Sequence, residues 1–133
     1  MSVSLLIITH NTIGQALADV ATTMLGSCPM PVDVLQVNSS DDPEKLISQA
    51  RELLANHPEG TLILTDMYGS TPSNIACKLA RQQDVRIVGG VNLPMLVRVL
   101  NYPRLDLDEL VQKAVSGGRD GVVTCQGTGA EHD

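Results

Sequence analysis

Aromatic residues are scarce in this chain of 133 residues: they make up 2% of it, and there is no Phe or Trp. With so few rings, the chain has no stacking platform for single-stranded nucleic acid. The net charge of −6 and a sequence pI near 4.8 argue further against nucleic acid or an anionic membrane as the main partner. An acidic surface of this kind would instead suit a basic protein partner.

Long apolar runs and targeting signals are also missing. No segment is apolar for long enough to cross a bilayer, and the N-terminus lacks the basic region and cleavage pattern of a signal peptide. The three cysteines, Cys28, Cys77 and Cys125, are odd in number and lack metal-ligand spacing, so we expect reduced thiols. These absences predict a cytoplasmic protein that needs no metal and no cofactor.

The chain is rich in aliphatic residues, which dominate a hydrophobic content of 43%. Buried-type strands are expected at 3–9, 32–37, 61–65 and 84–91, each followed by a helical pattern. This alternation predicts one α/β domain with an open parallel sheet, strand order 2-1-3-4, and helices on both faces. A short fifth strand is expected at 121–124, and 127–133 should be a polar tail.

Two of these strands end on titratable residues. The first ends on His10, and the third ends on Asp66, where Gly69 then lets the backbone turn. In open parallel sheets, ligands gather at the carboxyl ends of strands where the connections diverge. If the first and third strands are neighbours, His10 and Asp66 meet at that edge.

The residues after Gly69 are typical of a helix start. Thr71 is placed to be the N-cap, and Pro72 stands where a first helical residue belongs. The free N–H groups of Ser73 and Asn74, with the helix dipole behind them, would favour an anion. Taken alone, this pattern is more typical of an ordinary strand-to-helix loop.

Helix boundaries follow from caps and apolar spacing elsewhere. A helix that opens at Asn11 or Thr12 should bury one apolar face. A second helix should run through 71–82. The last helix should open with a capping box and end at a glycine pair, and His57 should be a solvated helix-end residue. The residues behind these expectations are Ile13, Leu17, Val20 and Met24 for the apolar face, Asp106 and Glu109 for the box, and Gly117 and Gly118 for the pair.

Three motifs together resemble the mannose-family EIIA domain of the bacterial phosphoenolpyruvate-dependent sugar phosphotransferase system (PTS). The resemblance runs from about Val3 to Val123, within a domain expected at 1–126. It rests on Thr9-His10, Asp66-x-x-Gly69-x-Thr71-Pro72-x-Asn74 and Gly90-Val91-Asn92-Leu93-Pro94-Met95-Leu96. It implies that His10 accepts a phosphoryl group from phospho-HPr and passes it to an EIIB histidine, which serves a membrane permease. Asp66 would orient His10, and Thr71 would lie beside the phosphate. The family also implies a homodimer in which the last strand crosses to the partner subunit.

The chemistry of these residue types fits that role. A neutral imidazole is a good nucleophile and forms a phosphoramidate that can be passed on. A carboxylate that accepts the proton of one ring nitrogen leaves the other nitrogen's lone pair aimed outward. Donors at a helix start, here Ser73 and Asn74, can hold the equatorial oxygens of the phosphoryl group.

Ser70 departs from the family pattern, which usually has a second glycine there. A backbone with positive φ at this position would cost a few tenths to about 1 kcal/mol. Other interpretations stay open: the phosphotransfer subunit of a dihydroxyacetone kinase, a regulatory PTS protein without a permease, or a structural interaction module. A receiver-like domain phosphorylated on Asp66 would need an acidic pair after the first strand, where Thr9 and His10 stand instead.

Overall fold

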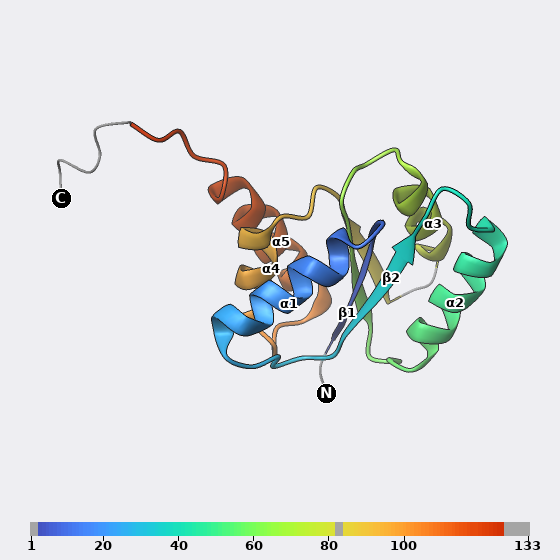
Figure 1. Cartoon of the computed structure of the whole chain (residues 1–133). Helices are drawn as coiled ribbons and strands as arrows, with labels where there is room; N and C mark the ends of the chain where they lie inside the picture. The colour runs from blue at the N-terminus through green and yellow to red at the C-terminus, as the bar shows by residue number, and fades with distance from the viewer. Residues whose placement is uncertain (1–2, 82–83, 127–133) are drawn as a thin grey trace.

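The computed structural model describes residues 3–81 and 84–126, and its centre is a four-stranded parallel sheet (Figure 1). The strands are β1 (Ser4–His10), β2 (Val32–Val37), β3 (Thr61–Thr65) and β4 (Val85–Val88). Their order is β2-β1-β3-β4, which confirms the predicted fold class and order. The fourth strand is shorter than the expected 84–91, because the chain leaves the sheet at Gly89 and turns at Gly90 with φ of 81°.

Helices cover both faces of the sheet (Figure 1). One face carries α1 (Ile13–Leu25), α4 (Leu93–Leu100) and α5 (Leu107–Asp120), and the other carries α2 (Pro43–Ala55) and α3 (Thr71–Leu79). The inner strand β1 serves both cores, since Leu5 and Ile7 join the first and Leu6 and Ile8 join the second. This alternation follows from the two-residue period of a strand and explains its continuous apolar sequence.

The buried face of α1 differs from the predicted one. Ile13, Val20 and Met24 are exposed to 45%, 46% and 61%, whereas Gly14 and Ala21 are buried. Small residues face the sheet because the helix lies close to it: a Cβ added to Gly14 would stand 2.9 Å from the Ile7 side chain. Leu17, the fourth residue of the predicted stripe, does pack against the core, so apolar spacing alone identified one of its four buried contacts correctly and missed the small residues that face the sheet.

The last helix is longer than predicted. The capping box of Asp106 and Glu109 is present, but α5 continues through Gly117 and Gly118 to Asp120. Both glycines lie against α4: an added Cβ would stand 2.7 Å from Arg98 Cβ at the first and 2.8 Å from Met95 Cε at the second. The glycine pair permits close helix packing and does not end the helix.

We expect Gly117→Val to lower the free energy of unfolding by about 1–3 kcal/mol, because the new side chain must push α4 and α5 apart. Urea denaturation measures the loss. Gln112→Val, at an exposed position of the same helix, is the control and should change stability by only about 0.5 kcal/mol. Equal stability of the two variants would contradict the close packing.

The segment after α5 forms no strand within this single chain. Residues 122–126 have no regular structure, and Val122 and Val123 are 79% and 78% exposed. The predicted fifth strand is therefore not part of this sheet, and its pairing with a second subunit stays a prediction. The predicted polar tail at 127–133 lies outside the described residues. In the described part, no helix is both long and apolar enough to cross a membrane.

Candidate active site

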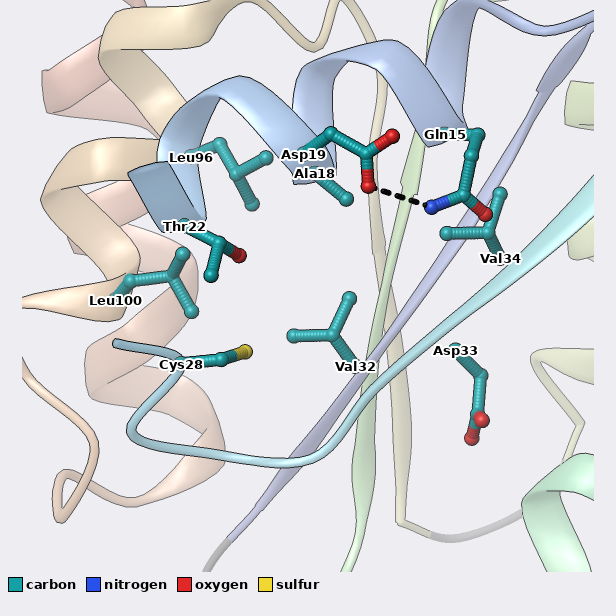
Figure 2. Close-up of a pocket in the computed structure, with 10 residues that line it drawn as sticks. All are labelled: Gln15, Ala18, Asp19, Thr22, Cys28, Val32, Asp33, Val34, Leu96 and Leu100. Carbon is teal, nitrogen blue, oxygen red and sulfur yellow. Dashed lines mark hydrogen bonds between the residues drawn. The ribbon is translucent and has the colours of Figure 1, made fainter. Parts of the chain in front are cut away.

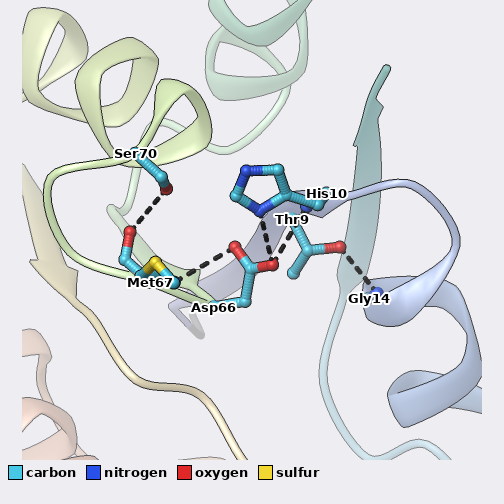
Figure 3. A network of polar contacts seen from close by, with 6 residues as sticks. All are labelled: Thr9, His10, Gly14, Asp66, Met67 and Ser70. Atoms are coloured by element: carbon cyan, nitrogen blue, oxygen red, sulfur yellow. Dashed lines mark hydrogen bonds and ion pairs between the residues drawn. The ribbon is translucent and has the colours of Figure 1, made fainter. Parts of the chain in front are cut away.

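His10 and Asp66 meet at the carboxyl edge of the sheet, as the strand endings predicted (Figure 3). In the parallel register, Ile8 lies opposite Thr65, the last residue of β3. His10 follows Ile8 by two residues and lies next to Asp66, the residue after β3. His10 Nδ1 lies 2.8 Å from Asp66 Oδ2. The His10 side chain is 46% exposed, against 13% for Asp66, so the carboxylate lies beneath a ring that faces solvent.

Three N–H groups hold the Asp66 carboxylate in place. Besides the ring, the backbone N–H of His10 donates to Oδ2 at 3.1 Å, and that of Met67 donates to Oδ1 at 3.1 Å. Burial raises the pKa of Asp66, but the hydrogen bonds from the His10 ring, the His10 backbone and its own backbone together lower it below the usual 3.8. Asp66 is therefore ionised at neutral pH.

An ionised carboxylate fixes the tautomer of His10. Because it can only accept hydrogen bonds, Nδ1 must carry the proton that joins the two side chains. The Nε2 lone pair is then free, and Nε2 is turned away from Asp66, on the side of Ser70 and the start of α3 (Figure 3). This arrangement supplies a nucleophilic nitrogen at the surface of the domain.

The turn between β1 and α1 contains contacts that the sequence analysis missed. Asn11 has φ of 49°, a left-handed conformation that Asn tolerates better than most residues. The helix begins at Ile13, and its N-cap Thr12 makes no side-chain cap bond. Instead, the buried Thr9 hydroxyl accepts the Gly14 N–H at 2.7 Å. A threonine just before a helix is a weak signal for such a bond, because its spacing of five residues differs from a cap.

Ser70 stabilises the loop that carries Asp66, without the backbone strain that a positive φ would cause. Its φ is −91°, whereas Gly69 has φ of 86°. The Ser70 hydroxyl donates to the Met67 carbonyl at 2.6 Å, and the Ser70 N–H donates to the same oxygen at 3.3 Å. A serine is therefore well accommodated where the resembling family has glycine.

The start of α3 differs in detail from the prediction. The N-cap is Ser70, without a side-chain cap bond, and Thr71 is the first helical residue. The Asn74 N–H is not free, since it donates to the Ser70 carbonyl at 2.8 Å. Among the described residues, the backbone N–H groups of Thr71 and Ser73 have no partner in the first turn of α3. Both are candidate donors to an anion.

The structure thus brings His10 and Asp66 into contact and places Thr71, Ser73 and Asn74 on the helix that follows. Thr71 is exposed, Ser73 is buried, and neither forms a hydrogen bond with His10 or Asp66 in the described part of the chain. Asn74 is exposed and lines a groove between α2 and α3.

Outside this edge, a separate cavity of about 250 Å³ lies between α1, β2 and α4 (Figure 2). It has an apolar floor that includes Val32, Val34 and Leu96, and it contains neither His10 nor Asp66. The described residues contain no cluster of three or more His, Cys, Asp and Glu side chains that could hold a metal ion.

His57 is not the solvated residue that we expected. It is half-buried, and its Nε2 lies 3.1 Å from Asp33 Oδ2 on β2. The contact joins the segment after α2 to the edge strand β2. The position of His57 at a helix end gave no indication of this neighbour, because Asp33 is distant in the sequence.

The site is therefore an exposed histidine held by a carboxylate at the carboxyl edge of a parallel α/β sheet. Comparisons with known proteins give the family of this domain. The family model EIIA-man, described as "PTS system fructose IIA component", matches residues 4–115. A search of the curated proteins gives no match.

Solved structures with the same fold span nearly the whole chain. The mannose/sorbose specific IIA subunit of the phosphotransferase system from Enterococcus faecalis has a TM-score of 0.84 at 23% identity, over 95% of this chain and 96% of that one. The EIIA component from Streptococcus agalactiae has a TM-score of 0.82 at 20% identity, over 92% and 96%. The PTS IIA protein associated with the fucose utilization operon of Streptococcus pneumoniae covers 100% of both chains, with a TM-score of 0.73 at 22% identity.

The chain belongs to the EIIA-man family of PTS IIA components. Membership confirms the family resemblance found in the sequence and gives the chain a phosphotransfer role in the sugar phosphotransferase system.

Proposed function

We propose that the chain carries a phosphoryl group on His10 Nε2, which it accepts from phospho-HPr and passes to an EIIB histidine. The observation that supports this most directly is the 2.8 Å contact between His10 Nδ1 and Asp66 Oδ2 under a ring that stays exposed. Through EIIB, the phosphoryl group would serve a membrane permease or a regulatory output of the PTS.

In the accepting step, the Nε2 lone pair of His10 attacks phosphorus in line with the nitrogen of the donor histidine. The Nε2–P bond forms as the donor's N–P bond breaks, and the bonding electron pair returns to the donor nitrogen. The proton on Nδ1 stays on the ring, and Asp66 stabilises the partial positive charge that develops there. The free N–H groups of Thr71 and Ser73 are the proposed donors to phosphoryl oxygens. Asn74 would contribute only through its side chain, because its N–H is already used.

Incubation with phosphoenolpyruvate, Enzyme I and HPr tests this proposal. We expect about one acid-labile, base-stable phosphate per chain, because a phosphohistidine is hydrolysed in acid and survives base. Omission of HPr is the control and should prevent labelling. Acid-stable phosphate, or none, would contradict the proposed function.

We also propose a homodimer in which the segment after α5 pairs with the partner's sheet. β4 is an edge strand, and an edge exposes unpaired backbone groups that another strand can cover. A groove of about 370 Å³ runs beside it, lined by residues that include Val88, Gly89 and Met95. The exposed Val122 and Val123 supply the apolar side chains for such a strand.

For this dimer we expect Val122→Asp/Val123→Asp to weaken association at least tenfold and to lower the Tm, because two charges would be buried in the interface. Removal of 121–133 should have the same effect. Sedimentation equilibrium at micromolar concentration measures association, with Ser48→Asp/Gln49→Asp at exposed positions of α2 as the control of equal charge. A wild-type chain that is monomeric under these conditions would refute the dimer.

A further inference from the structure

A groove on the outer surface between α2 and α3 carries a concentration of positive charge. It has a volume of about 620 Å³ and is lined by Arg51 from α2 and by Asn74, Cys77, Lys78 and Arg81 from α3 and the residues after it. All five residues are exposed. Cys77 and Lys78 follow Asn74 by three and four residues and so lie on the same face of α3, and Arg81 follows in the turn after the helix. We call this feature the basic groove.

The three cations of the basic groove have no internal partners in the part of the chain that the structure describes. Among the described residues, the side chains of Arg51, Lys78 and Arg81 form no ion pair or hydrogen bond, and no carboxylate lines the groove. Arg98, by contrast, is paired with Asp120 at 2.9 Å. Like charges gathered without counter-charges repel one another, so folding does not explain this cluster. An external anion would relieve the repulsion.

The basic groove begins beside the candidate active site. α3 begins at Thr71, at the end of the loop that follows Asp66, and Asn74 lies in the first turn of that helix. From there the groove runs away from His10 through Lys78 to Arg81. An interface of standard size covers about 800 Å² on each partner, so a macromolecule docked at the exposed ring of His10 can extend over the start of α3 and onto the near end of the basic groove (Figure 3).

The form of the groove indicates what kind of anion it fits. A pocket for a small molecule encloses most of its ligand and has a largely apolar lining, whereas here every lining residue is exposed and nearly all are polar. Nucleic acid is disfavoured because the whole chain carries a net charge of −6 and has few aromatics. Long basic side chains around an open groove suit an acidic protein surface, which they can attract over a distance.

We propose that the basic groove docks an acidic surface of a protein that exchanges phosphoryl groups with His10. This inference rests on the proposed function and adds a positioning element to it. The chain as a whole is acidic, which would suit a basic partner. The positively charged groove differs from this surface and would contact an acidic region of the partner. A local patch of one sign on a surface of the other sign orients a partner as well as attracts it.

Charge reversal tests the proposal. Lys78→Glu/Arg81→Glu removes two cations of the groove, and Lys45→Glu/Arg104→Glu makes the same net charge change at exposed residues that do not line it. Rapid-quench kinetics then measure two second-order rate constants at 25 and 250 mM salt: transfer from phospho-HPr to the chain, and from the phosphorylated chain to a mannose-family EIIB. Inorganic phosphate binding, followed by NMR titration, is a parallel measurement.

We expect the groove variant to slow at least one of the two transfers tenfold or more at low salt, with the maximal rate at saturating partner unchanged. The control variant should stay within threefold of wild type, and the salt dependence of the affected step should flatten in the groove variant. Equal effects of both variants, or no effect on either transfer, would overturn the proposal. So would phosphate binding to the groove with both transfers unchanged, because the occupant would then be a small anion. Loss of wild-type labelling would instead contradict the proposed function itself.

Discussion

His10→Ala is expected to abolish phosphorylation of the chain by phosphoenolpyruvate, Enzyme I and HPr. The Nε2 of His10 is the acceptor in the proposed reaction, and alanine has no nitrogen to replace it. Labelling with radioactive phosphoenolpyruvate, followed by gel electrophoresis at alkaline pH, measures the loss. The expected decrease is at least about 10³-fold, to the background of the assay.

His57→Ala is the matched control for that variant. His57 is half-buried against Asp33 on β2, so its nitrogen is not presented to a partner as that of His10 is. We expect it to be labelled normally, and likewise His132→Ala, which changes a residue outside the described part of the chain. Normal labelling of His10→Ala, with circular dichroism that shows a folded protein, would disprove the assignment of His10.

Asp66→Asn is expected to slow phosphoryl transfer by about 10²–10⁴-fold while the protein stays folded. Asparagine keeps the size of the side chain, but its amide can present N–H groups to Nδ1. The ring would then carry its proton on Nε2, and the nucleophilic lone pair would be lost. Rapid-quench transfer from phospho-HPr gives the rate, and an NMR measurement of the His10 tautomer gives the cause.

The pH dependence of the free energy of unfolding tests whether Asp66 acts as an ionised partner of His10 and not only as a packed side chain. The pKa of Asp66 is lower in the folded state than the usual 3.8, so ionisation of Asp66 stabilises the fold above that value. This stabilisation should be lost as the pH falls below 3.8 through the folded pKa. The stability difference between wild type and Asp66→Asn should shrink over the same range. Full transfer activity in Asp66→Asn, or a stability difference that does not change with pH, would refute the orienting role.

Much of the architecture could be predicted because it depends on local patterns. Continuous aliphatic runs such as 4–10 and 61–65 indicate strands buried on both faces, and their alternation with helices leaves a parallel sheet as the consistent topology. The capping box of Asp106 and Glu109 could be predicted because its contacts lie within three residues of sequence. The position of His10 and Asp66 at strand ends followed from the same patterns.

The errors share one cause, which is packing between segments that are distant in sequence. Gly117 and Gly118 read as a helix end, yet α4 requires small residues there, and the helix continues. The stripe of Ile13, Val20 and Met24 reads as a buried face, yet the close approach of α1 to β1 requires Gly14 instead. The spacing of apolar residues indicates which residues share a helix face, but it does not indicate how closely the neighbouring helix or sheet packs against that face.

The sequence by itself determined the chemistry of this protein: a histidine and an aspartate at strand ends, a turn glycine and a helix start after them. Only the tertiary structure decided that these groups cooperate. The parallel pairing of β1 with β3 brings His10 Nδ1 to Asp66 Oδ2, over a separation of 56 residues. The same folding sets α2 beside α3 and so joins Arg51 to Lys78 and Arg81. Local sequence specifies which groups each segment carries, whereas their distances depend on the packing of the whole domain.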